Sequence, residues 1–149
     1  KVVREIENIA SEWKTLADGS LGKNDAYQVR LTVDMTKDNT WRLSNGREDF
    51  LEFYVNSTAR TIVAKRNGST GASSFSASFS LPALRLPVTG TDDVIELDIY
   101  VDRSSVEFIT ADGTSAMTMI VFPENIYDKI ECTSGEIDGK VRSLARIWK

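Results

Sequence analysis

The fold of this chain is constrained most by short segments in which apolar and polar residues alternate. Between residues 95 and 101, Ile95, Leu97, Ile99 and Val101 occupy every second position. Residues 27–35 show the same period of two. Because successive side chains of a β-strand point to opposite faces, this period indicates strands with one face in a core and the other toward water.

Turn signals recur between these segments. The pairs Asn45-Gly46 and Asp112-Gly113 and the triplet 56–58 favour hairpin turns, and Asp112-Gly113 is expected to form a tight turn in which both residues adopt positive φ. Residues 81–87 contain two prolines and suit an edge strand or an extended connector. Strands are expected at residues 27–35, 41–44, 50–55, 60–66, 95–101, 106–110, 115–122, 128–133 and 141–148.

These roughly ten short strands predict an all-β, antiparallel two-sheet β-sandwich. No interval is long enough for the crossover helices of a parallel sheet. Residues 2–13 differ, because their apolar positions lie near helical spacing, so this segment is expected to form a short helix or a connector. We expect residues 1–149 to form a single domain.

Composition excludes several classes of function. The sequence has no histidine and one cysteine, Cys132, which removes the commonest general base and thiolate zinc sites. We therefore expect no metal site and no cofactor, and we interpret Cys132 as a small buried hydrophobe. A net charge of −4 without a basic run weighs against nucleic acid or membrane partners. No apolar run reaches the ~20 residues that span a bilayer.

One stretch carries a family resemblance. It reads Ile99-Tyr100-Val101-Asp102-Arg103-Ser104-Ser105-Val106-Glu107-Phe108 and is followed by Asp112-Gly113. It resembles the signature of the C-terminal β-sandwich of family 32 glycoside hydrolases, the β-fructosidases (levanases, inulinases and invertases). Residues 3–9, 25–27, 141–144 and 147–148 are also similar to this family, so the resemblance covers nearly the whole chain. One departure is Lys65-Arg66, where the family often has an Asp-Arg pair.

The resemblance implies a domain without its own catalytic residues. Family 32 enzymes are retaining glycosidases that need two carboxyl groups, and these lie in a five-bladed β-propeller that precedes the sandwich. The family's Asn-Asp-Pro-Asn, Arg-Asp-Pro and Glu-Cys-Pro motifs do not occur here. The resemblance implies that residues 1–17 lead in from an upstream propeller, the expected partner, and that the longer protein is secreted, periplasmic or cell-surface.

Sugar binding requires an aromatic platform with planar polar groups nearby. The candidates are Tyr100, Trp41 and Tyr54, of which Tyr100 falls on the outward side of its strand. The alternative is that these aromatic side chains fill the core or cover an edge.

Two carboxylates flank the turn at residues 103–105. Asp102 and Glu107 could form a glycosidase pair, but the interpretation favoured here is that Asp102 caps the turn while Arg103 pairs with Glu107 or a neighbouring strand. Trp13 and Trp148 are expected to pack against the edge of the sandwich or against the propeller.

Three functional hypotheses follow. The leading one is a non-catalytic accessory domain that stabilises and flanks the propeller of a glycosidase acting on fructans or sucrose. The second is an autonomous carbohydrate-binding module with fructan as its ligand. The third is a lectin-like or adhesive sandwich of an unrelated family, which would share only the fold with family 32 domains.

Overall fold

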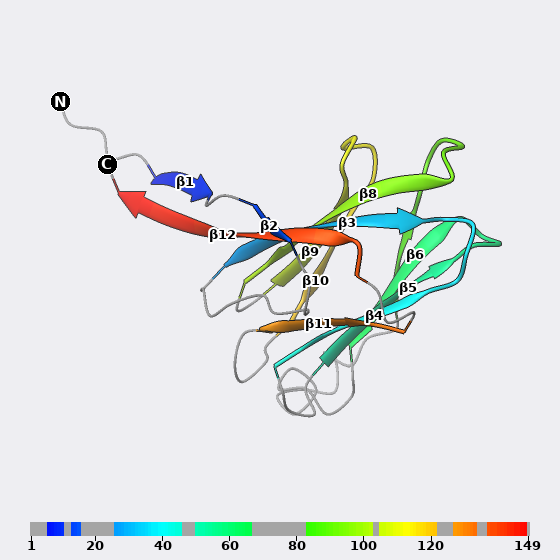
Figure 1. Cartoon of the computed structure of the whole chain (residues 1–149), viewed down its shortest axis with the longest axis horizontal. Coiled ribbons are helices and arrows are strands. Elements are labelled where there is room, and N and C mark those ends of the chain that lie inside the picture. Colours follow the sequence, from blue (N-terminus) through cyan, green and yellow to red (C-terminus); the bar gives the residue numbers. More distant parts are fainter. Residues whose placement is uncertain are drawn as a thin grey trace.

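The computed structural model describes residues 6–10, 13–15, 26–45, 50–66, 83–102, 105–121, 127–133 and 137–148. These residues form twelve strands in two antiparallel sheets, and this part of the chain contains no helix. The predicted antiparallel β-sandwich is therefore confirmed (Figure 1).

The larger sheet has seven strands in the order β1-β12-β3-β8-β9-β10, and β2 pairs with β12 on the same side as β1. The smaller sheet has five strands in the order β11-β4-β5-β6-β7. The seven strands are β1 (Ile6–Ala10), β2 (Lys14–Thr15), β3 (Tyr27–Asp34), β8 (Val94–Val101), β9 (Ser105–Thr110), β10 (Ala116–Ile120) and β12 (Gly139–Trp148). The five are β4 (Thr40–Ser44), β5 (Phe50–Asn56), β6 (Thr61–Arg66), β7 (Leu84–Pro87) and β11 (Lys129–Cys132). The proline-flanked β7 lies at a sheet edge, as predicted.

The core lies between the two sheets and follows the period of two. In β3, Val29, Leu31 and Val33 are fully buried, while the residues between them belong to the outer face. Phe53 of β5 stacks on Trp41 of β4 with ring centroids 5.3 Å apart, and it meets Phe108 of β9 edge-on at 5.2 Å. Since β9 belongs to the other sheet, this aromatic cluster joins the two layers.

A buried hydrogen bond also connects the sheets. The hydroxyl of Tyr27, the first residue of β3, donates to the backbone carbonyl of Tyr127, which lies just before β11. Tyr27 is fully buried, and burial is the main reason why its pKa is raised well above the usual range, with Asp128 and Tyr127 adding to the shift. The hydroxyl therefore remains a donor at any physiological pH.

The expectation of a short N-terminal helix is wrong for the described part of that segment. Ile6–Ala10 forms β1, which pairs with residues 144–148 of β12. β12 continues past the start of β3, where Leu144 N donates to Ala26 O, and beyond that point its residues pair with β1 on the opposite edge. The backbone N–H and C=O groups at an open strand edge need hydrogen-bond partners. This requirement outweighs the helical spacing of the apolar residues in the N-terminal segment.

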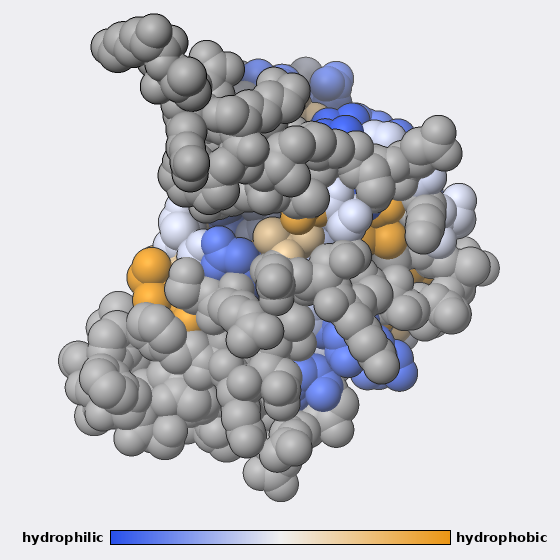
Figure 2. Space-filling model, turned by 90° about the vertical axis from the view of Figure 1, so that its left-hand side faces the viewer, coloured by the Kyte–Doolittle hydropathy of each residue, from blue (hydrophilic) through white to orange (hydrophobic). Residues whose placement is uncertain are grey.

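This two-stranded extension marks one end of the sandwich, at the left of Figure 1. Seen from that end, the described residues expose hydrophilic and hydrophobic patches next to one another (Figure 2).

The Asp112-Gly113 turn is a hairpin turn, but not the tight one expected. Gly113 has φ of 75°, whereas Arg60 is the one described non-glycine residue with positive φ, so Asp112 does not adopt it. The connection between β9 and β10 is longer, with hydrogen bonds from Gly113 N to Thr110 O and from Thr110 N to Ser115 O. Asp112 instead accepts from the backbone N (3.0 Å) and Oγ1 (2.7 Å) of Thr114, which stabilises a wider loop.

Acid should weaken this loop. Hydrogen bonds from Thr114 and Thr110 lower the pKa of the Asp112 carboxyl below its usual range. A depressed native pKa stabilises the fold above the unfolded value near 4, and the stabilisation is lost as the pH falls through the native pKa. Urea unfolding at pH 7 and at pH 3 should therefore show a smaller acid-induced loss of stability for Asp112→Asn than for the unmodified chain. An equal loss in both proteins would contradict this assignment.

Gly139 is required by a close backbone approach. A Cβ at this position would lie 2.7 Å from the backbone oxygen of Arg30 and 2.7 Å from Cδ2 of Leu31. Because β12 is paired with β3 here, neither strand can move without disturbing the register. We expect Gly139→Ala to lower the free energy of unfolding by about 1–3 kcal/mol. Gly90→Ala is the informative contrast. No atom lies within 4 Å of a Cβ at Gly90, so an alanine there would be strained only by the φ of +84°.

Candidate functional site

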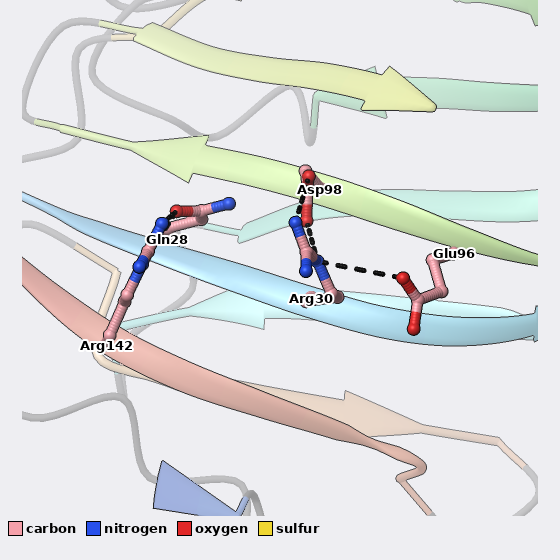
Figure 3. A network of polar contacts seen from close by, with 5 residues as sticks. All are labelled: Gln28, Arg30, Glu96, Asp98 and Arg142. Atoms are coloured by element: carbon pink, nitrogen blue, oxygen red, sulfur yellow. Dashed lines mark hydrogen bonds and ion pairs between the residues drawn. The ribbon is translucent and has the colours of Figure 1, made fainter. Parts of the chain in front are cut away.

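Polar side chains gather on the outer face of the seven-stranded sheet, across β12, β3 and β8 (Figure 3). Residues 27, 29 and 31 point into the core, so Gln28 and Arg30 point outward by parity. Their strand partners on this face are Arg142 and Lys140 of β12 and Tyr100 and Asp98 of β8. The sheet register therefore builds one continuous polar surface, which we call the outer polar face.

An ion pair between Arg30 and Asp98 lies at its centre. Arg30 Nε donates to Asp98 Oδ1 at 2.7 Å, and Nη2 donates to Oδ2 at 3.0 Å. The Asp98 side chain is 8% exposed and that of Arg30 29%, although both lie outside the core. Glu96 Oε2 adds a weaker contact, 3.9 Å from Arg30 Nε. Both carboxylate oxygens of Asp98 accept from one guanidinium, an arrangement that suits a structural carboxylate rather than one that transfers protons.

A second pair lies beside it. Arg142 donates from Nε (2.9 Å) and Nη2 (2.7 Å) to Oε1 of Gln28, which is 1% exposed. Because guanidinium N–H groups only donate, the atom that faces Arg142 is the amide oxygen. The two arginines thus join β3 to both of its neighbours, since Arg142 links β12 to β3 and Arg30 links β3 to β8.

Trp13 covers the cationic part of this face. Its ring lies 4.3 Å from Cζ of Arg142, 5.0 Å from Nζ of Lys140 and 5.3 Å from Cζ of Arg30. Three cations within about 6 Å of an indole ring make cation–π contacts that hold it against the sheet. Trp13 was expected at a sheet edge or an interdomain contact, and the structure places it on the sheet, immediately before β2.

Tyr100 and Glu107 belong to the same face. They are cross-strand partners on β8 and β9, and both are half-buried. The outward direction predicted for Tyr100 is therefore correct.

Asp102 caps the hairpin that follows, as predicted. Its Oδ1 accepts from Ser105 N at 2.8 Å, and its own N–H donates to Ser105 O at 3.1 Å. Arg103 lies outside the described residues. Trp148 is in β12 opposite Ile6, and its side chain is outside what the structure describes.

The three sugar-binding candidates do not form one platform. Trp41 is 4% exposed and stacks on Phe53, so it fills the core and presents no ring face to a ligand. Tyr54 lies on the outer face of the five-stranded sheet, on the far side of the core from Tyr100. The physical reason for the Trp41 result is register, because Trp41 pairs with the inward residue Phe53.

Sequence reasoning missed the centre of this face. Gln28, Arg30, Asp98 and Arg142 could be placed on outward positions by the period of two, but their partners are 68 and 114 residues away. Within the described ranges, no group of three or more His, Cys, Asp or Glu residues is arranged to hold a metal ion. Among these residues there is also no helix long and apolar enough to cross a membrane.

Comparison with known families decides the classification. Residues 3–149 match the sequence model described as "Glycosyl hydrolases family 32 C terminal". The chain belongs to this family. This family 32 C-terminal domain is similar to the levanase of Bacillus subtilis (strain 168), with 25% identity over 98% of the chain and 24% of the levanase.

Two solved structures share its fold. One is sucrose-6-phosphate hydrolase from Lactobacillus gasseri, with a TM-score of 0.67 and 22% identity over 91% of this chain and 28% of the hydrolase. The other is exo-inulinase from Aspergillus awamori, with a TM-score of 0.66 and 19% identity over 97% of this chain and 29% of the inulinase. The family 32 C-terminal domain thus spans between about a quarter and three tenths of these relatives.

Proposed function

We propose that this domain is the non-catalytic C-terminal β-sandwich of a glycosidase that acts on fructans or sucrose. Its role is to stabilise and flank a catalytic β-propeller that precedes it in the same longer protein. The observation that carries the proposal is the family match over residues 3–149, combined with relatives of which this chain covers only 24–29%. The names of those relatives (levanase, exo-inulinase and sucrose-6-phosphate hydrolase) support the substrate class.

The described site supports a structural role. Asp98 is neutralised by Arg30, and Gln28 is held by Arg142, so the central groups of the outer polar face are fixed rather than poised for proton transfer. The catalysis of a retaining glycosidase needs two carboxyl groups about 5–5.5 Å apart, of which one transfers a proton. Asp102 is engaged in its hairpin cap. We therefore assign the chemistry to the propeller.

Hydrolysis assays test the proposal directly. This chain alone, at high concentration, should release no fructose from levan, inulin or sucrose, whereas the longer protein that contains it should release fructose from at least one of them. Fructose release by this chain alone, lost on Asp102→Asn or Glu107→Gln, would overturn the non-catalytic assignment. A longer protein inactive on all three substrates would overturn the substrate class.

Heat inactivation of the longer protein tests the flanking role. In the longer protein, removal of residues 1–149 should lower the temperature at which hydrolytic activity is lost on heating. Trp13→Ala in that protein tests whether the residue that anchors β2 to the sheet contributes to this stabilisation, and Arg85→Ala, on the exposed edge strand β7, is the control. Unchanged heat inactivation after removal of the domain would contradict the flanking role.

A further inference from the structure

A polar depression lies at the end of the sandwich opposite β1. Its volume is about 370 Å³, and it is lined by Asp38, Asn39, Thr40, Tyr54, Val55, Asn56 and Thr133. β3 begins beside β12 at Tyr27 and ends at Asp34, at the right of Figure 1. Residues 38–40, which follow that end of β3, line the depression. The volume lies in the lower part of the range for small-ligand sites.

Asn39 is held in one orientation at the floor of the depression. Its Oδ1 accepts from Thr40 N (3.0 Å), Thr133 Oγ1 (2.9 Å) and Cys132 Sγ (3.3 Å). The backbone N–H of Thr40 can only donate, so the atom facing it is the amide oxygen. The NH₂ group of Asn39 therefore points away from this cluster, and no hydrogen bond from it occurs among the described residues.

Asp38 supplies acceptors at the rim. Its Oδ1 accepts from Ser57 Oγ (2.7 Å) and Ser57 N (2.9 Å), and no bond to Oδ2 occurs among the described residues. The Ser57 hydroxyl and then its backbone N–H hold the pKa of the Asp38 carboxyl below its usual range, so it is a charged acceptor at neutral pH. Asn56 is similarly fixed through Oδ1, which accepts from Ala59 N at 3.2 Å.

Tyr54 adds an apolar ring beside these groups. It is half-buried on the outer face of the five-stranded sheet, between Thr40 of β4 and Val63 of β6. An aromatic ring with a hydroxyl offers both a surface for C–H groups and a hydrogen-bonding tip. The depression thus combines one ring with fixed amide donors and a fixed carboxylate acceptor.

We propose that this depression is an accessory carbohydrate-binding site, with Tyr54 as the platform and Asp38 and Asn39 as the groups that bind vicinal hydroxyls. A sugar ring presents C–H groups on one face and hydroxyls that both donate and accept around its edge. A carboxylate acceptor next to amide donors matches two neighbouring hydroxyls, and a site built in this way discriminates against ligands that lack them.

The charge of the depression selects a neutral sugar. Among the described residues, its lining includes the carboxylate of Asp38 and no cationic side chain. A phosphorylated or carboxylated sugar would place a second negative charge beside Asp38, which is unfavourable. Fructan oligosaccharides are neutral, and this choice of ligand rests on the proposed function.

Calorimetric titration of the chain with levan- and inulin-derived tetrasaccharides tests the site. We expect saturable binding, weakened at least about tenfold by Tyr54→Ala and by Asp38→Ala and changed less than about threefold by Tyr54→Phe, a tenfold change being about 1.4 kcal/mol. Tyr100→Ala tests the competing candidate, a half-buried outward tyrosine on the other sheet. Arg85→Ala, at an exposed position of β7 that does not line the depression, is the control. Both variants should bind as the unmodified chain does.

Chemical-shift mapping on the unmodified chain keeps the test independent of whether the variants fold. Fructan tetrasaccharide should shift the amide signals of residues 38–40, 54–56 and 133. Absence of binding at 10 mM tetrasaccharide, or binding lost on Tyr100→Ala and retained on Tyr54→Ala, would overturn the proposal. Binding of maltotetraose but not of fructan would overturn the choice of ligand. None of these outcomes depends on hydrolysis by the longer protein, so failure here is distinguishable from failure of the proposed function.

Discussion

Replacement of Phe53 by alanine is expected to lower the free energy of unfolding by about 3–5 kcal/mol. Phe53 is fully buried, stacks on Trp41 at 5.3 Å and meets Phe108 of the other sheet at 5.2 Å. Removal of the ring leaves a cavity where the two sheets meet, and it deprives both neighbouring rings of a contact. A loss of this size is a large part of the stability of a typical domain.

Urea denaturation followed by tryptophan fluorescence measures this change, and Trp41 reports on the cavity directly. Phe53→Leu is the control, because it keeps most of the volume and should cost less than about 1.5 kcal/mol. Equal destabilisation by leucine and alanine would show that the ring contacts matter rather than the filled volume. A loss below about 1 kcal/mol for alanine would contradict the packing described here.

Arg30→Ala should produce the second largest effect, a loss of about 2–4 kcal/mol. Removal of one partner leaves the Asp98 carboxylate, 8% exposed, without its two charge-assisted hydrogen bonds. Loss of a partner from a fully buried pair costs about 3–5 kcal/mol, and the expected value is set lower because Arg30 is 29% exposed. Trp13 would also lose one of its three cationic contacts.

A double variant separates the cost of the unpaired carboxylate from the cost of lost packing. Arg30→Met combined with Asp98→Leu should recover most of the stability lost in Arg30→Ala, because the unpaired carboxylate is then absent. Arg85→Ala, at an exposed position of β7, should change stability by less than about 0.5 kcal/mol. If the double variant is as unstable as Arg30→Ala, the cost does not come from an orphaned carboxylate.

The strands could be predicted well because the alternation of apolar and polar residues matches the face of each strand that packs in the core. Residues 95–101 and 27–35 were expected as strands, and β8 (Val94–Val101) and β3 (Tyr27–Asp34) differ from them by one residue at one end. Their inward apolar side chains form part of the buried core, namely Val29, Leu31 and Val33 of β3 and Leu97, Ile99 and Val101 of β8. The predictions were wrong where pairing with another strand or a side-chain hydrogen bond determined the local structure. β1 forms because β12 offers an open edge, and the Asp112 loop widens because Thr114 donates to Asp112.

The candidate site was less predictable because its contacts are long-range. Parity placed Tyr100 outward, and turn chemistry predicted the Asp102 cap. Trp41 faces the core because β4 pairs with β5 in a register that places Trp41 opposite the inward residue Phe53. No local pattern reveals that Arg30 meets Asp98 or that Arg142 meets Gln28. Those pairs exist only because β3 lies between β8 and β12.

The place of β12, the last strand of the chain, between β1 and β3 has a consequence for biosynthesis. Gln28 and Arg142, whose side chains pair across β3 and β12, are 114 residues apart in the chain. At roughly 5–20 residues per second, a ribosome needs on the order of 6–20 s between making one and the other. Once β8 (Val94–Val101) has been made, β3 has β8 on one side, and its other edge stays unpaired until β12 is made. The nascent domain is therefore most exposed to misassociation just before its last strand emerges, when a chaperone that shields strand edges would help it most.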